Sequence, residues 1–100
     1  MQPGDYLDTH YIGIRKESEA DLQCTYLFIC TRYRRVEGKR MESLGDVTGT
    51  FTISKEDGST QLIKPMQGDE RLCAYERAAY KIKKRWAAGE FPSSDVFCSG

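Results

Sequence analysis

Residues 69–88 limit the fold more than any other part of the chain, because their apolar side chains repeat with the period of an α-helix. At about 100° per residue, one narrow arc collects Leu72, Tyr75, Ala79, Ile82 and Trp86. The opposite side collects Arg77, Lys81, Lys84 and Arg85. Asp69 is suited to cap the N-terminus, and Gly89 with Pro92 ends the helix. Strand patterns precede this helix, so we expect it to cover one face of a sheet.

Two strands are predicted in the first third of the chain. Residues 10–16 alternate Ile12 and Ile14 with polar or small residues, and a polar connection follows. Residues 22–33 have the strongest strand pattern. One side of this strand would carry Leu22, Cys24, Tyr26, Phe28 and Cys30, and the other side Leu27, Ile29 and Tyr33. Apolar residues on both sides are typical of a central strand that is covered, at least in part, on both faces.

Two hairpins are predicted next. The dipeptide Glu37-Gly38 predicts a two-residue turn that returns the chain as residues 39–44, with Arg35 directly opposite Arg40. Glycines mark the expected bend or bulge of the returning strand, at Gly45 and Gly49.

The dipeptide Asp57-Gly58 predicts a type I′ turn, because both central residues of that turn need positive φ. Residues 60–64 would then pair back on the preceding strand, with Leu62 opposite Ile53.

Together these segments predict an α+β fold, in which an antiparallel sheet of four to five strands is packed on one face by a single C-terminal helix. Residues 1–100 form one small domain, with flexible or docking ends at 1–9 and 91–100. The uncovered face would carry Leu27, Ile29 and Leu44, an apolar patch of the kind that is usually buried. Two covers stay open: the tail, through Phe91, Val96 and Phe97, or a second copy of the chain in a homodimer.

The composition predicts a folded, cytoplasmic protein without a membrane partner. Its 39% hydrophobic and 11% aromatic residues set it apart from disordered chains. The longest apolar run, residues 26–30, is too short for a membrane span, and the polar start is unlike a signal peptide. The 15 basic and 15 acidic side chains cancel. Attraction to a charged partner must therefore come from local segregation of charge.

No reaction site is predicted. The four cysteines lack paired C-x-x-C spacing, and His10, the one histidine, lies far from them, so we expect no metal site. Cys24 and Cys30 are expected to be small core residues of a reduced protein. His10 has no cysteine or serine partner in its sequence context, and the glycines lack the spacing of a phosphate-binding loop. These patterns predict a protein that is not an enzyme and needs no cofactor.

Two local clusters of basic residues are candidate binding sites. The hairpin cluster contains Arg32, Arg34, Arg35, Lys39 and Arg40. The helix cluster contains Arg77, Lys81, Lys84 and Arg85, with Lys83 on its flank and Tyr80 beside it. Such charges also simply solvate a hairpin tip and an exposed helix face, and this alternative stays open. As contact surfaces they suit a polyanion or an acidic protein, and an aromatic ring among cations suits a stacked base or a protein hot spot.

Two stretches carry a resemblance to a known family. Residues 30–45, CTRYRRVEGKRMESLG, followed by residues 76–92, ERAAYKIKKRWAAGEFP, resemble the arm-type DNA-binding domain of phage and island tyrosine-recombinase integrases. In that family a three-stranded sheet backed by a helix enters the DNA groove. The resemblance spans residues 12–92 and implies DNA contacts by Arg32, Arg34, Lys39 and Arg40. Residues 46–68 add a hairpin to the family pattern.

The leading prediction is therefore a non-catalytic binding module that contacts nucleic acid through the basic hairpin and the helix cluster. The alternative is a small accessory or inhibitory protein that binds an acidic protein surface.

Overall fold

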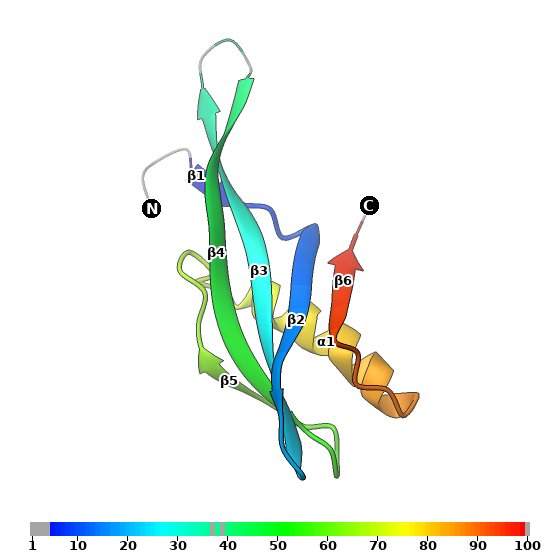
Figure 1. Ribbon diagram of the computed structural model, residues 1–100. Coiled ribbons are helices and arrows are strands. Elements are labelled where there is room, and N and C mark those ends of the chain that lie inside the picture. Colours follow the sequence, from blue (N-terminus) through cyan, green and yellow to red (C-terminus); the bar gives the residue numbers. More distant parts are fainter. Residues whose placement is uncertain (1–4, 37, 39, 100) are drawn as a thin grey trace.

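The computed structural model describes residues 5–36, 38 and 40–99, and its fold is α+β: a six-stranded antiparallel sheet with one helix packed against it (Figure 1). The predicted fold class is confirmed, but the sheet has six strands where four to five are predicted, because both chain ends contribute strands. The elements in chain order are β1 (Asp5–Leu7), β2 (Tyr11–Glu19), β3 (Gln23–Val36), β4 (Arg40–Ser54), β5 (Thr60–Lys64), α1 (Cys73–Ala87) and β6 (Ser94–Cys98).

The sheet has the strand order β5-β4-β3-β2-β6, and β1 pairs with β3 beyond the end of β2. The β3–β4 hairpin is by far its longest part, and its outer half projects past β2, β5 and β6 (Figure 1). We call this projection the arm; it comprises the described residues 32–36, 38 and 40–45. It makes the molecule elongated, with principal extents of 50 × 24 × 19 Å.

The core lies between α1 and one face of the sheet. On β3, Cys24, Tyr26, Phe28 and Cys30 point into it, as the alternation of that strand predicts. On the helix, the buried residues are Ala74, Ala78, Ala79 and Ile82. Three alanines leave room for large aromatic rings on the sheet, so the helix lies close above them. Leu22, which the pattern places on the same side, is 62% exposed, because β3 begins only at Gln23.

The helix begins four residues later than predicted. Residues 69–72 form a turn in which the Leu72 N–H donates to the Asp69 carbonyl, and Leu72 itself has φ 57°. The carboxylate of Asp69 still caps the helix, because it accepts from the N–H groups of Ala74 and Tyr75 at 3.0 and 3.1 Å. The capping role of Asp69 is therefore right, and the predicted boundary is wrong.

The arm hairpin has a different register from the predicted one. Val36 pairs with Arg40 and Arg35 pairs with Met41, so the predicted Arg35–Arg40 pair is wrong. Three residues separate the paired positions, of which Glu37 and Lys39 lie outside the described residues. The predicted bulge at Gly45 is confirmed: the register shifts there, and Gly45 has φ 94°.

The second hairpin also differs from its prediction. Ser54 and Ser59 close a loop of four residues, and Leu62 pairs with Phe51 while Thr60 pairs with Ile53. The reason lies in tertiary packing around Gly58, which has φ 73°. A Cβ on Gly58 would lie 2.5 Å from Cε3 of Trp86, so the indole packs directly on its backbone. Packing against the helix, rather than turn preference alone, selects this loop.

The tail does not cover the second face of the sheet, as one alternative predicts. Residues 94–98 instead form β6, an edge strand paired with β2, so the described parts of both predicted chain ends include strands. Phe91 and Phe97 pack against the core on the helix side. The Tyr26 hydroxyl donates to the Pro92 carbonyl at 3.0 Å and fixes the approach to β6. The side of the sheet opposite α1, called the open face below, therefore has no cover among the described residues.

Candidate binding surfaces

Two arginines of the predicted hairpin cluster hold a buried carboxylate. Asp5 on β1 has a fully buried side chain, and its Oδ1 lies 3.0 Å from Nε of Arg34 while its Oδ2 lies 3.9 Å from Nη2 of Arg32. These contacts fasten β1 to the arm. Arg35 points to the opposite side of β3 and is exposed. Lys39 lies outside the described residues, and only the backbone of Arg40 is described.

Two arginines of the helix cluster are also engaged by other parts of the molecule. Nη1 of Arg77 donates to the Thr9 carbonyl at 2.7 Å, and its guanidinium lies over the Phe97 ring. Arg85 donates from Nε and Nη2 to the two carboxylate oxygens of Asp95 at 2.7 and 3.3 Å. Burial raises the pKa of Asp95, but the bonds from Arg85 and the Val96 N–H outweigh it and hold the pKa below its usual range. These pairs fasten α1 to the sheet.

The remaining part of the helix cluster faces solvent. Tyr80 is 57% exposed, and Nζ of Lys84 lies 5.4 Å from its ring centroid. Lys83 is exposed and Lys81 is half-buried. A hollow of about 250 Å³ and one of about 160 Å³ flank this ridge, the first beside Tyr80 and Lys83 and the second beside Lys81 and Lys84. We call Tyr80, Lys83 and Lys84 the outer helix surface.

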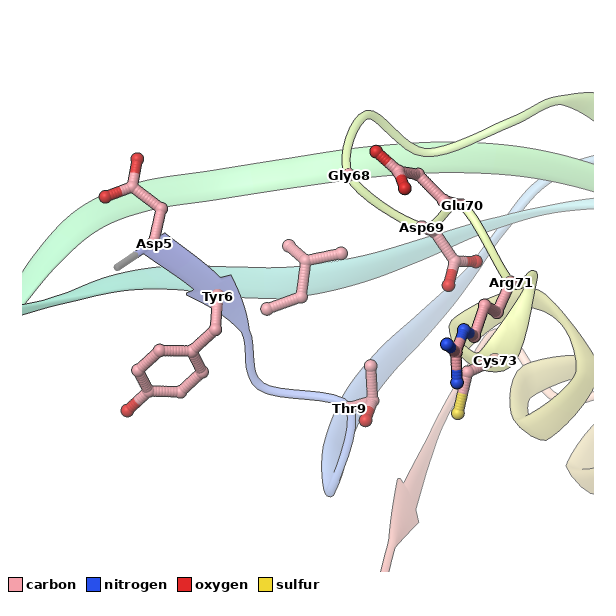
Figure 2. A pocket seen from close by; sticks show the side chains of 9 residues that line it. Asp5, Tyr6, Thr9, Gly68, Asp69, Glu70, Arg71 and Cys73 are labelled. Carbon is pink, nitrogen blue, oxygen red and sulfur yellow. The ribbon is translucent and has the colours of Figure 1, made fainter. Parts of the chain in front are cut away.

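A shallow hollow of about 400 Å³ lies between β1 and the start of α1 (Figure 2). Its lining residues are Asp5, Tyr6, Leu7, Thr9, Gly68, Asp69, Glu70, Arg71 and Cys73. Asp5 is engaged by the arm arginines and Asp69 by the helix N–H groups, so both buried carboxylates already have partners. These two carboxylates therefore have structural roles at the hollow.

The open face presents paired residues from five strands. Its rows of paired residues include Cys98–Tyr11, Val96–Gly13–Ile29–Thr48, and Ser94–Arg15–Leu27–Thr50–Lys64. Leu27 and Ile29 lie on this face as predicted, but only half-exposed and among threonines. Leu44 falls at the Gly45 bulge and belongs to none of the paired rows.

Charge on the open face is mostly positive. Arg15 and Lys64 lie at the two ends of one row, and Arg35 lies on the arm. Asp46 is the one carboxylate among the paired residues of this face in the described part of the chain, and it accepts from Thr31 Oγ1 at 2.9 Å. No ion pair to Arg15, Lys64 or Arg35 occurs among the described residues.

Tyrosines accompany these cations. Tyr6 on β1 pairs with Tyr33 on β3, and their rings stack with centroids 5.8 Å apart. Figure 2 shows Tyr6 and Asp5 projecting to opposite sides of β1, so the tyrosine faces away from the buried carboxylate. Tyr11 follows on β2 and is 57% exposed. The rings thus form a strip that leads from the arm toward the centre of the open face.

Sequence reasoning missed several of these residues. Arg15, Lys64, Tyr6 and Tyr11 are absent from the predicted clusters, which follow runs of basic residues along the chain. For Tyr11 and Arg15 a signal exists: both alternate with Ile12 and Ile14, whose burial places them on the outer face. Lys64 reaches the same row only through the sheet register, which the sequence does not reveal.

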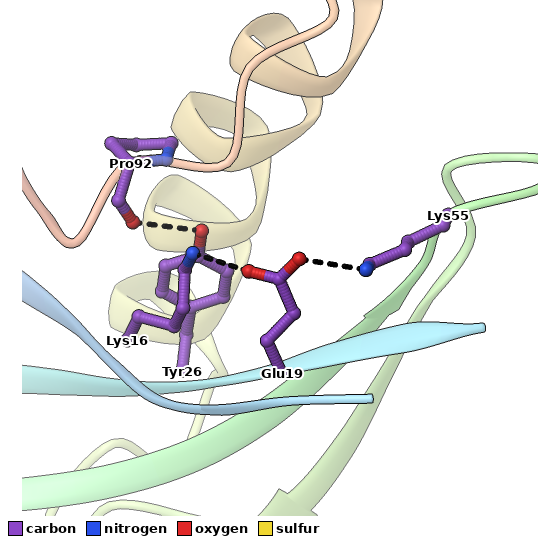
Figure 3. A network of polar contacts seen from close by, with 5 residues as sticks. All are labelled: Lys16, Glu19, Tyr26, Lys55 and Pro92. Carbon is purple, nitrogen blue, oxygen red and sulfur yellow. Dashed lines mark hydrogen bonds and ion pairs between the residues drawn. The ribbon is translucent and has the colours of Figure 1, made fainter. Parts of the chain in front are cut away.

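The end of the molecule opposite the arm is acidic. The turns after β2 and β4 expose Asp21, Glu56 and Asp57, and Glu17 is exposed near the end of β2. Within this end, Glu19 accepts from Nζ of Lys16 at 2.6 Å and from Nζ of Lys55 at 2.7 Å (Figure 3). The bonds from Lys16 and then Lys55 lower the pKa of Glu19 to about 2. Charge is therefore segregated along the molecule although its total is zero.

The cysteines and the histidine have structural surroundings. Cys24 and Cys30 are buried and unbridged, as predicted, and burial raises the pKa of Cys30 to about 12. Nδ1 of His10 lies 2.9 Å from Ser99 Oγ, which joins the start of β2 to the end of β6. Among the described residues, no three His, Cys, Asp or Glu side chains are placed to hold a metal ion. The described helix is too short and too polar to cross a membrane.

Comparison with known proteins adds no family to this picture, and the resemblance to integrase arm-type domains stays a prediction. No family model, no curated protein and no solved structure matches the chain.

Proposed function

We propose that the protein is a non-catalytic nucleic-acid-binding module whose contact surface is the open face with the adjoining arm. One observation carries the proposal: the open face gathers Arg15, Lys64 and Arg35 around exposed tyrosines and threonines, with Asp46 as its one paired-row carboxylate among the described residues. By contrast, the arginines at the centre of both predicted basic clusters are engaged by Asp5, Asp95 and Thr9.

The chemistry of the open face suits a phosphate backbone. Arginine, lysine and the hydroxyls of threonine and tyrosine are the side chains that contact phosphate and sugar oxygens most often. The threonines that are partly or fully exposed on this face are Thr25, Thr31, Thr48 and Thr50, whereas Thr52 is buried. A neutral protein with a positive face and an acidic far end would also approach a polyanion in one preferred orientation.

The integrase resemblance supports the same surface. In that family the sheet enters the DNA groove. Here α1 covers one face of the sheet, so the open face and the arm are the parts of the sheet that remain free to contact nucleic acid. The residues concerned differ from those that the resemblance implies, since Arg32 and Arg34 pair with Asp5 on the helix side.

Fluorescence anisotropy with labelled oligonucleotides tests the proposal. For three phosphate contacts, the plot of log affinity against log salt should have a slope between about −2 and −3. The double variant Arg15→Ala/Lys64→Ala should bind much more weakly and with a slope near −1. The double variant Lys83→Ala/Lys84→Ala removes the same charge from the outer helix surface and should bind like the parent.

Two results would contradict the proposal. The first is the absence of binding to single-stranded and duplex DNA and RNA at low salt with micromolar protein. The second is equal weakening by the two double variants, because it would show that only total charge matters.

A second candidate function is binding of an acidic protein surface by the outer helix surface. The exposed ring of Tyr80, between two hollows and beside Lys83 and Lys84, favours it, because exposed tyrosines among cations are typical of interface hot spots. A photo-crosslinking residue at position 80 should then capture one protein in stoichiometric amount, and Lys83→Ala/Lys84→Ala should abolish the capture. Failure of nucleic-acid binding together with this result would establish the second candidate.

A further inference from the structure

We propose that the ligand is a single strand of nucleic acid that lies along the open face, with unpaired bases stacked on Tyr11 and on the Tyr6–Tyr33 pair and phosphates held by Arg15, Lys64 and Arg35. This inference rests on the proposed function and specifies its ligand.

The width of the open face favours a single strand. From β5 to β6 the sheet spans four strand spacings, about 19 Å at ~4.8 Å each. The major groove of B-DNA is about 12 Å wide, so the five-stranded face is too broad to enter it, and only the two-stranded arm would fit. A single strand needs no groove and lies across a broad sheet, with its backbone following the cations.

The exposed tyrosine rings favour unpaired bases. Tyr11 is 57% exposed and Tyr6 is 37% exposed, and both lie on the open face. In a duplex the faces of the bases are already stacked on each other, whereas splayed bases of a single strand stack on aromatic side chains. Neither tyrosine ring is needed in the core, which lies on the other face of the sheet.

Between the tyrosine rings and the basic side chains, the centre of the open face is apolar and includes a glycine. Gly13 has no side chain, and its neighbours across the sheet are Ile29 and Val96. A Cβ at Gly13 would meet Ile29 Cβ at 3.8 Å, so the backbone there is covered only thinly. Tyr11 and Arg15 stand on either side of Gly13 along β2. This apolar surface between the Tyr11 ring and the Arg15 guanidinium suits a base whose phosphate contacts Arg15.

The charge of the face disfavours a second copy of the chain as occupant. In a symmetric dimer the same patch meets itself, so Arg15, Lys64 and Arg35 would face the same three cations with one Asp46 from each copy to offset them. Like charges in such a contact oppose association. A polyanion, in contrast, brings negative charges to these three cations.

Binding of matched single-stranded and duplex oligonucleotides of about 12 nucleotides tests the inference, with the whole chain at one salt concentration. The single strand should bind at least tenfold more tightly than the duplex. Tyr11→Leu and Tyr33→Leu should each weaken single-strand binding by about five- to 150-fold, the range that loss of one stacked base produces. Tyr80→Leu removes an equally exposed ring from the helix and should have no effect.

Each outcome separates this inference from the proposed function. Equal or tighter binding of the duplex, with no loss in Tyr11→Leu, would overturn the single-strand inference and leave nucleic-acid binding intact. Lack of binding to either oligonucleotide would overturn both. Tyr11→Phe removes only the hydroxyl and keeps the ring. Retained binding by Tyr11→Phe together with weakened binding by Tyr11→Leu would show that the ring acts by stacking and not through a hydroxyl contact. Circular dichroism and sedimentation of each variant check that it is folded and monomeric.

Discussion

The two faces of the sheet are built from the same strands but obey different constraints. On the covered face, Tyr26, Phe28 and Phe51 are fully buried, and their rings pack on one another and on Tyr75. On the open face, the directly neighbouring positions of β3 are Thr25, Leu27 and Ile29, which are only partly buried. A change on the covered face must therefore disturb packing, whereas residues on the open face remain free to serve a ligand.

The two faces also differ in charge. Charged groups at the margin of the covered face are paired: Arg34 with Asp5 and Arg85 with Asp95 across the fold, and Lys16 with Glu19 within β2. Arg15, the neighbour of Lys16 in sequence, points to the open face and has no ion pair among the described residues. Intramolecular contacts thus engage four of the seven sequence-predicted cations whose side chains are described: Arg32, Arg34, Arg77 and Arg85. The cations of the open face run across strands instead of along them.

The largest expected effect is on the covered face. Phe28→Ala should lower the free energy of unfolding by about 3–5 kcal/mol, because it removes a fully buried ring that packs on Phe51 and Tyr75. Leu27→Ala, one residue away on the open face, should cost less than about 1.5 kcal/mol, since Leu27 is only partly buried. Urea denaturation of both variants measures the difference. Similar losses would mean that the open face is buried in solution.

A pair of glycines provides a second test of intermediate size. Gly49 lies under the Phe28 ring, and a Cβ there would come within 2.3 Å of Cζ. Gly49→Ala should therefore destabilise the protein by about 1–3 kcal/mol through overpacking. Gly13→Ala is its counterpart on the open face, where the new methyl group meets only ordinary contacts, and should change stability by no more than about 0.5 kcal/mol. Thermal melts compare the two. A larger loss at Gly13 would contradict the assignment of faces.

The alternation of β2 and β3 was enough to predict which residues form the core. It gave Cys24, Tyr26 and Phe28 as inward residues, and periodicity alone identified the helix that covers them. Turn lengths were less predictable, because the conformation of Gly58 depends on the Trp86 ring packed against it from another element. The strand with which the C-terminal residues pair was equally unpredictable. Val96 and Phe97 alternate as an edge strand would, but alternation does not say which strand they join.

The candidate site was the least predictable part, because it depends on which charges cancel inside the fold. Asp5 and Arg34 are 29 residues apart, and their pairing follows only from the register of β1 on β3. Arg85 and Asp95 meet because β6 returns to the sheet beside the helix. A basic run along the chain therefore says little about the charge that a partner would meet. Face-by-face alternation, as for Tyr11 and Arg15, is the better guide.

The smallest expected effect concerns the acidic end, where Glu19 joins Lys16 and Lys55 at the margin of the covered face. The pKa of Glu19 is lowered from 4.5 to about 2 in the folded protein, so its ionised form stabilises the fold at all pH values above about 4.5. That contribution is lost as the pH falls from about 4.5 to about 2, where the folded protein also takes up the proton. Glu19→Gln should therefore be slightly less stable than the parent at pH 7, and the difference should vanish near pH 2. High salt should shrink the difference at pH 7, because these side chains are partly exposed.

Glu17→Gln, a neighbouring exposed glutamate without an ion pair among the described residues, is the control and should match the parent in the same urea titrations. A Glu19→Gln difference that persists unchanged at pH 2 would mean that this side chain acts through packing and not through its charge.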